Sequence, residues 1–318
     1  MKTFGKLAIA ASVLLLIGGT VAAAGAVIAY KNEEGAVSER VEKHYVAEGA
    51  ASALKVKTYS GSINVVKGDV ETIKIDYKDK EDDPQVEFTF VDGVLEMKEK
   101  EKQWFNWVGE FVWPWNYDKI FDNVTTITVP MDSDIDYKIA ATSGSIYVEN
   151  ATSSKDLIID CTSGSVTVKN CNIGGKVDLD AISGSVSIEN LTAGKDINVD
   201  ATSGRITMDN LTSGGKIDLR GISGTIKGEN IKCESLEADC TSGKVDLLKV
   251  DAEKSIDIGA VSGSINLSVV DAEENYNFKV NKMSGSANVE TKTNAGATKT
   301  MNLNVTSGSI YVTFNAND

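Results

Sequence analysis

The dipeptide Ser-Gly recurs in this chain with a period of about twenty residues. Such a repeat constrains the fold more than composition does, because each unit must bury its apolar face against its neighbours. An additional copy at Ser60 stands apart from the array. The nine regular copies begin at Ser143, Ser163, Ser183, Ser203, Ser223, Ser242, Ser262, Ser284 and Ser307, at intervals of 20, 20, 20, 20, 19, 20, 22 and 23 residues.

Each repeat contains two segments that alternate apolar and polar residues. Residues 177–181 read Val-Asp-Leu-Asp-Ala, and residues 186–189 read Val-Ser-Ile-Glu. This alternation is typical of strands with one buried face, and Ser-Gly between them favours a turn, since glycine adopts positive φ freely. The turn residues are Ser143, Gly144, Ser163, Gly164, Ser183, Gly184, Ser203, Gly204, Ser223 and Gly224.

Two short strands and two turns in twenty residues predict an all-β fold, a single-stranded parallel β-solenoid (β-helix). Each coil should rest on the previous one, so nine coils at ~4.8 Å would form a rod of roughly 43 Å.

Seven residues after the serine, five successive repeats have asparagine. Stacked amides can donate hydrogen bonds to one another along the axis, as in cross-β ladders. The sequence favours a structural ladder, with a ligand-binding row as the alternative. The ladder residues are Asn150, Asn170, Asn190, Asn210 and Asn230.

Acidic residues form two further columns, three and five residues before the serine. Both columns should face solvent, where they would keep the rod soluble. Paired oxygen ligands also suit Ca²⁺, so a weak Ca²⁺ or polycation surface is the alternative. We otherwise expect no cofactor. The candidate metal residues are Asp160, Asp178, Asp180, Asp200 and Asp218.

An aromatic segment lies between the isolated first copy and the regular array, after a hairpin expected at residues 87–98. It contains all four tryptophans of the chain. Three roles are open: a cap or side cover, a partner-binding or glycan-stacking patch, and insertion into the outer leaflet of a membrane. The candidate binding residues are Trp104, Phe105, Trp107, Phe111, Trp113, Trp115 and Tyr117.

The N-terminus contains an uncharged run at residues 7–29, long enough for one transmembrane helix. Lys2 and Lys6 precede the run, which places the N-terminus in the cytoplasm and the rest outside. A signal peptide cleaved at Ala24-Gly25 is the alternative, and would yield a secreted protein.

Composition excludes several function classes. The formal charge of −14 and only three arginines argue against a nucleic-acid partner. The single histidine, His44, rules out a Ser-His-Asp triad in the array and any multi-histidine metal site. A polysaccharide-degrading enzyme needs carboxylates clustered irregularly in one cleft, whereas the acidic residues here form regular columns. We therefore expect no enzyme.

The repeats resemble a known family at residues 141–148, Ala-Thr-Ser-Gly-Ser-Ile-Tyr-Val, and 306–312, Thr-Ser-Gly-Ser-Ile-Tyr-Val. This is the bacterial β-strand-repeat domain family of unknown function described as "putative adhesins". The resemblance implies a membrane-anchored member with no catalytic residues to carry over. It also implies a Gram-positive source and, for some relatives, a link to envelope stress.

The predicted organisation has four parts. Residues 1–30 form the transmembrane anchor or signal peptide, and residues 31–53 a linker. Residues 54–136 hold the first solenoid strands with the hairpin and the aromatic insertion, and residues 137–318 the regular repeats. The expected function is a non-enzymatic cell-surface solenoid or adhesin that binds an envelope or extracellular partner. An envelope-stress sensor acting through a membrane partner is the alternative, and a polysaccharide-degrading enzyme a remote one.

Overall fold

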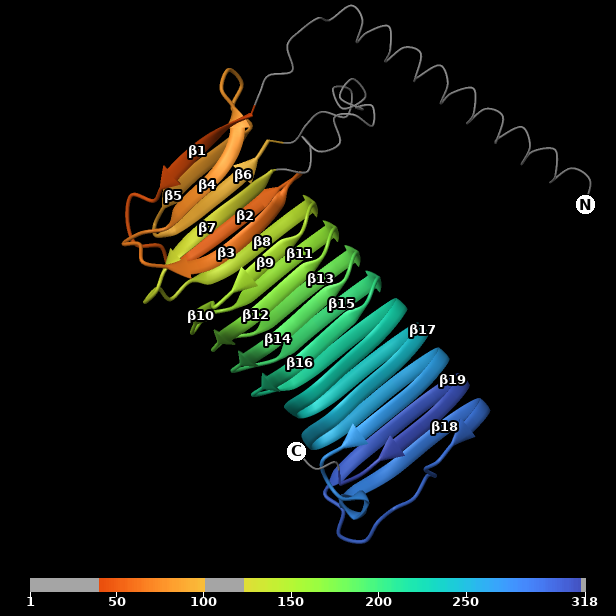
Figure 1. Ribbon diagram of the computed structural model, residues 1–318. Helices are drawn as coiled ribbons and strands as arrows, with labels where there is room; N and C mark the ends of the chain where they lie inside the picture. Colours follow the sequence, from red (N-terminus) through yellow and green to blue (C-terminus); the bar gives the residue numbers. More distant parts are fainter. Residues whose placement is uncertain (1–39, 101–122, 316–318) are drawn as a thin grey trace, which may run out of the picture.

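The computed structural model describes residues 40–100 and 123–315, which form an elongated all-β rod (Figure 1). This part of the chain holds one 3₁₀ turn, η2 (Glu273–Asn275), and no helix long and apolar enough to cross a membrane. The strands are β1 (Arg40–Val46), β2 (Ala53–Thr58), β3 (Ser62–Gly68), β4 (Lys74–Lys80), β5 (Val86–Val91), β6 (Val94–Glu99), β7 (Val124–Pro130), β8 (Asp136–Ser143), β9 (Ile146–Glu149), β10 (Thr152–Ser153), β11 (Leu157–Ser163), β12 (Val166–Ile173), β13 (Val177–Ser183), β14 (Val186–Ala193), β15 (Ile197–Ser203), β16 (Ile206–Ser213), β17 (Lys216–Val269), β18 (Tyr276–Ala287) and β19 (Lys299–Thr313).

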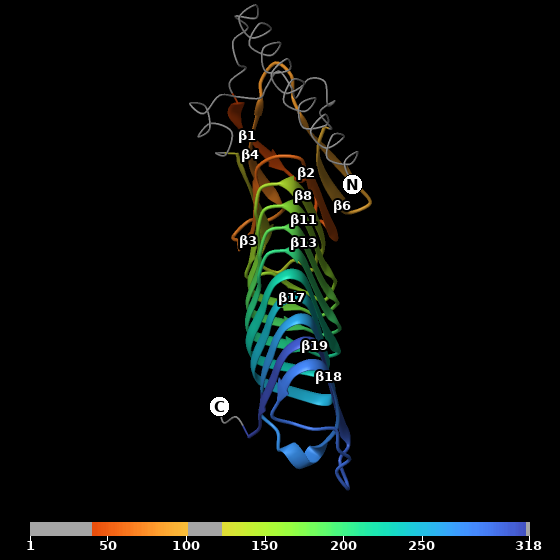
Figure 2. The same ribbon diagram turned by 90° about the vertical axis from the view of Figure 1, so that its right-hand side faces the viewer.

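The regular coils pair in parallel with an offset of one sequence period. In β11, β13 and β15, Leu157 pairs with Val177 and Val177 pairs with Ile197. The strands after the corner pair in the same way, as Val166 does with Val186. Figure 2 shows the corners of successive coils stacked along the rod. The repeat β-solenoid predicted from the Ser-Gly period is therefore present.

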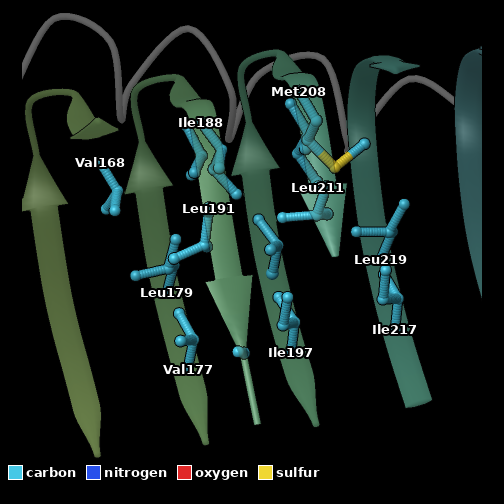
Figure 3. Packing of buried hydrophobic residues seen from close by; sticks show 14 of the residues in the cluster. Val168, Val177, Leu179, Ile188, Leu191, Ile197, Met208, Leu211, Ile217 and Leu219 are labelled. Atoms are coloured by element: carbon cyan, nitrogen blue, oxygen red, sulfur yellow. The ribbon is translucent and has the colours of Figure 1, made fainter. Parts of the chain in front are cut away.

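The core consists of columns of branched aliphatic side chains between the two strand faces (Figure 3). Leu179, Val199 and Leu219 occupy successive rungs and are fully buried. Burial of each such side chain contributes about 1.5–3 kcal/mol. The four cysteines are also buried and free, and burial raises the pKa of the Cys171 thiol to about 11.

Glycine at the corner is required mainly by the close approach of successive coils. A Cβ on Gly164 would lie 2.1 Å from the carbonyl oxygen of Gly144, and one on Gly184 would lie 1.7 Å from that of Gly164. The expected positive φ is found at Gly144 (118°) and Gly164 (148°). It is not found at Gly184, where the neighbouring carbonyl alone excludes a side chain.

The two ends of the rod depart from sequential stacking. β2 lies between β6 and β8, and β3 lies between β7 and β9. At the other end β19 lies between β17 and β18. The prediction that each coil rests on the previous one is therefore wrong for the terminal coils. β2 and β3 each pair with two strands that are not their neighbours in sequence, whereas β19 pairs with its neighbour β18 and, on the other side, with β17.

Antiparallel strands cover the N-terminal end. β4 pairs with both β1 and β7, and β5 and β6 form the predicted hairpin around Asp92 and Gly93. The rings of Tyr45 and Phe88 stack with centroids 4.1 Å apart. The predicted linker at residues 31–53 therefore contains a strand, β1, because its alternating residues pair with β4 and pack Tyr45 on the core.

Candidate functional site: an axial groove beside the Ser-Gly corners

Two hollows on the outside of the rod are lined by the same three repeat positions. We number positions from the serine of each corner, so that positions −3 and −1 face outward on either side of the small inward residue at position −2. We call the combined feature the axial groove. The first hollow (≈ 240 Å³) is lined by Asp160, Cys161, Thr162, Asp180, Ala181, Ile182, Asp200 and Thr202. The second (≈ 850 Å³) is lined by Asp239, Cys240, Thr241, Gly259, Ala260, Val261, Val280, Asn281, Lys282, Met283, Asn304, Val305 and Thr306.

Position −3 supplies an acidic wall. Asp160, Asp180 and Asp200 occupy consecutive rungs. Partial burial and the neighbouring aspartates raise the pKa of Asp180 to about 6, and burial likewise raises the pKa values of Asp200 and Asp239. Among the described residues no lysine or arginine forms an ion pair with Asp160, Asp180 or Asp239. This wall therefore carries negative charge that the rod itself leaves largely uncompensated.

Arg220 occupies the rung between the two hollows. Its Nη2 lies 2.8 Å from Oδ2 of Asp218, and its Nη1 lies 3.9 Å from Oδ2 of Asp200. Nζ of Lys216 lies 3.0 Å from the same Asp218 oxygen. Asp218 was expected to face solvent, but only 7% of it is exposed, because these two basic side chains accompany it in the sheet surface. Its Oδ1 is buried without a hydrogen-bond partner.

Position −1 supplies the opposite wall, where threonine alternates with a larger apolar residue. Ile182, Ile222 and Val261 are each about half exposed, and Met283 is 85% exposed. The alternation continues to the C-terminal end because β19 places Thr306 between Val261 and Met283. In spatial order the wall reads Thr162, Ile182, Thr202, Ile222, Thr241, Val261, Thr306 and Met283.

The candidate metal residues lie in rows. Asp160, Asp180 and Asp200 follow one line along the rod, while Asp178 and Asp218 belong to the neighbouring column with Asn198 between them. Carboxylates in a row do not converge on one point, as Ca²⁺ coordination requires. Over residues 40–100 and 123–315 no group of three or more acidic, histidine or cysteine side chains could hold a metal ion.

The five asparagines occupy equivalent turn positions on the far side of the second strand, and the four from Asn170 to Asn230 are joined in a ladder of side-chain hydrogen bonds. Their φ angles lie between 51° and 58°, in the left-handed region that asparagine tolerates better than most residues. Nδ2 of Asn190 donates to Oδ1 of Asn170 (2.8 Å), and Nδ2 of Asn210 donates to Asn190 (2.9 Å). Nδ2 of Asn230 donates to Asn210 (3.0 Å). Because these amides bond mainly to one another, the ladder is a structural feature of the turn.

The aromatic candidates lie outside the described residues, as does the run at residues 7–29. The described strands before and after the aromatic segment are β6 and β7, in which Lys98 pairs with Lys57 and Val124 pairs with Ser62. Glu99 accepts hydrogen bonds from the backbone N–H groups of Tyr59 (2.6 Å) and Ser60 (2.9 Å).

Sequence reasoning missed the groove. The signal was visible as the alternation of threonine with isoleucine or valine immediately before the serine. The sequence interpretation considered only the charged columns at positions −5 and −3. The alternation at position −1 is continuous only in the spatial order of the last two coils, which the sequence does not give.

Comparison with known proteins gives the family. Residues 51–317 match the domain family described as "Toastrack DUF4097". The chain belongs to this family. No curated protein matches it.

Solved structures with similarity to this Toastrack chain include three bacterial proteins. A "putative adhesin" from Parabacteroides distasonis is 12% identical, with 87% of this chain and 98% of that chain covered and a TM-score of 0.41. One from Bacteroides fragilis is 16% identical, with 86% and 97% covered and a TM-score of 0.38. A "putative cell adhesion protein" from Clostridium sporogenes is 9% identical, with 87% and 100% covered and a TM-score of 0.28.

Proposed function

We propose that this protein is a non-enzymatic, surface-exposed solenoid that binds an envelope or extracellular partner along its axial groove. The observation that carries the proposal is the groove itself. It combines an acidic wall, which spans the first hollow and reaches Asp239, with exposed apolar side chains along both hollows. Several exposed apolar side chains gathered along one face are typical of interaction surfaces.

The rod suits a binding role because its surface is pre-organised. Except in the terminal strand β18, the groove residues stand on strands that pair with strands on both sides, so binding requires little ordering of the backbone. A row of equivalent rungs can also contact a long partner at many points, each contributing a modest free energy.

We also propose that the rod is held outside the cytoplasm by residues 7–29, either as a single-pass anchor or, after cleavage at Ala24-Gly25, as a secreted protein. The support is the uncharged run itself, with lysines before it and glutamates after it.

The proposal is tested by binding of the purified chain to whole cell envelopes. One variant replaces Ile182, Ile222 and Val261 with serine. A second replaces Trp104, Trp107, Trp113 and Trp115 with alanine. The groove proposal expects at least a tenfold loss in the first variant, with folding checked by circular dichroism. Unchanged envelope binding by the first variant and loss by the second would contradict it in favour of the aromatic segment.

A further inference from the structure

We propose that the axial groove binds a basic, proline-rich segment in the polyproline II conformation, with a lysine or arginine at every third residue. The inference rests on the proposed function, since it names the partner of the same groove. It follows from the repeat length of the apolar wall and from the distribution of charge along the acidic wall.

The apolar wall repeats every second rung, and the acidic wall has an aspartate on each rung of one alternate set. Asp180 and Arg220 occupy the same position on the rungs between. Asp160, Asp200 and Asp239 stand on alternate rungs, opposite Thr162, Thr202 and Thr241. The rungs between them carry the larger apolar residues Ile182, Ile222 and Val261. With rungs ~4.8 Å apart, this pattern repeats every ~9.6 Å.

A polyproline II helix has nearly the same repeat. It advances ~3.1 Å per residue with three residues per turn, so equivalent side chains recur every ~9.3 Å. Asp160 and Asp239 lie four rungs apart, about 19 Å, and six residues of the helix advance about 19 Å. An extended strand instead repeats its side chains every ~6.8 Å, which fits neither one rung nor two.

The paired backbone beneath the groove favours the same conformation. β11, β13 and β15 pair in parallel on both sides, so a ligand lying across them cannot add as another strand. A polyproline II segment needs no backbone hydrogen-bond partner. Recognition must therefore come from side chains, with basic groups on the acidic wall and proline rings against the apolar wall.

Charge selects the register. Asp160, Asp180 and Asp239 have no ion pair with a basic residue in the described part of the chain, whereas Oδ2 of Asp200 lies 3.9 Å from Nη1 of Arg220. Arg220 stands on a rung between Asp200 and Asp239. A ligand with a basic residue every third position meets the three alternate aspartates and places no positive charge on the Arg220 rung.

The test uses the full chain and synthetic twelve-residue peptides, with binding followed by fluorescence anisotropy. One peptide repeats Lys-Pro-Pro four times, and its control has four consecutive lysines followed by eight prolines. The proposal expects the regular peptide to bind at least tenfold more tightly than the block control. Equal affinities would overturn it, because charge alone would then explain binding. Binding of a neutral β-1,4-linked oligosaccharide in place of both peptides would also overturn it.

Variants locate the site. Asp200→Asn should weaken binding of the regular peptide about threefold, and the combination with Asp160→Asn and Asp239→Asn at least tenfold. The matched control is Asp251→Asn, outside the groove, where the side chain is 41% exposed compared with 43% for Asp200. These changes keep side-chain size and relieve repulsion between rungs, so the variants should fold. Equal loss in control and groove variants would contradict the assignment.

The same variants separate the inference from the proposed function. If the peptide fails to bind but the serine variant of the apolar wall loses envelope binding, the groove functions with another partner and only this inference is wrong. If neither ligand depends on the groove, both are wrong.

Discussion

The central coils and the terminal coils of this rod both pair in parallel, but the order in which their strands stack differs. From β11 to β16 each strand lies between the strands one period earlier and one period later. At the ends a strand is placed between two others out of sequence order, β2 between β6 and β8, and β19 between β17 and β18.

The difference shows that a repeat fixes the geometry of a rung but does not fix the order of rungs. When coils stack in sequence order, each new coil closes only a short loop of chain. When a terminal strand is inserted between two others, the stability of that end depends on contacts between segments farther apart in the sequence. The order of the coils also determines the groove surface. Threonine and apolar residues alternate as far as Met283 only because Thr306 lies between Val261 and Met283.

The largest expected loss of stability comes from a substitution in a central coil. Gly184→Ala should destabilise the protein by about 3 kcal/mol or more, because the new Cβ would lie 1.7 Å from a backbone carbonyl oxygen. Gly285→Ala creates a similar clash in β18 at the end. There we expect lost hydrogen-exchange protection in β18 alone, because a terminal coil has one neighbour.

Gly221→Ala is the control for both. It stands at position −2, where the other regular coils before the last two have alanine or cysteine, and its nearest new contact would be 3.4 Å. Urea melts should show a change of less than about 0.5 kcal/mol. A loss at Gly221 equal to that at Gly184 would show that the carbonyl contact is not the cause.

A medium effect is expected in the asparagine ladder, which only the regular coils possess. Asn190→Ala removes ladder hydrogen bonds to Asn170 and Asn210 and leaves alanine at φ 53°. We expect a loss of about 2 kcal/mol. Asn190→Gly, which accepts this φ, should lose about 1 kcal/mol. If both variants lost the same free energy of unfolding in denaturant melts, the whole effect would come from the amide hydrogen bonds and none from the positive φ.

A smaller effect concerns the acidic wall. The pKa of Asp180 is raised from 3.8 to about 6, so the folded state holds this proton more tightly than the unfolded state. The group therefore reduces stability at pH 7. The penalty shrinks as pH falls below about 6 and is gone below the unfolded pKa of 3.8. Asp180→Asn should add about 1 kcal/mol at pH 7, after allowance for solvent screening, and nothing at about pH 3. An equal gain at both pH values would contradict this.

The smallest effect on stability is expected at the C-terminal end. Lys282 occupies position −2, which is small and buried in the central coils, but it is exposed in β18. A charge at this position of an edge strand discourages pairing with another molecule. Lys282→Ala should leave the melting temperature nearly unchanged but promote end-to-end association in sedimentation velocity. If the Lys282→Ala variant stayed monomeric at all concentrations, Lys282 would not be the residue that prevents end-to-end association.

The strands, the corners and the asparagine column could be predicted from the repeat, whereas features that depend on single residues or on the order of the coils could not. Alternation around Ser183 identified both strands of a coil, and the asparagine column identified its ladder. The burial of Asp218 was not predictable, because it depends on Lys216 and Arg220 two residues away on either side. Strand β1 was missed because its residues resemble a charged linker until β4 pairs with them.

The order of the last two coils was the hardest feature to predict. The Ser-Gly intervals of 22 and 23 residues show that the array becomes irregular, but spacing carries no information about which strand pairs with which. The groove was missed for the same reason, since its second hollow contains residues from β17, β18 and β19 together.

Cysteine crosslinking at the C-terminal end tests the coil order most directly. Asp257 pairs with Asn302, and Asn302 pairs with Lys279, so Asp257 and Lys279 lie two rungs apart, ~9.6 Å and beyond disulfide reach. The pair Asp257→Cys with Asn302→Cys should therefore form a disulfide on oxidation, while Asp257→Cys with Lys279→Cys should not. The opposite result would show that the coils stack in sequence order, and the continuous alternation of the groove wall would be lost with it.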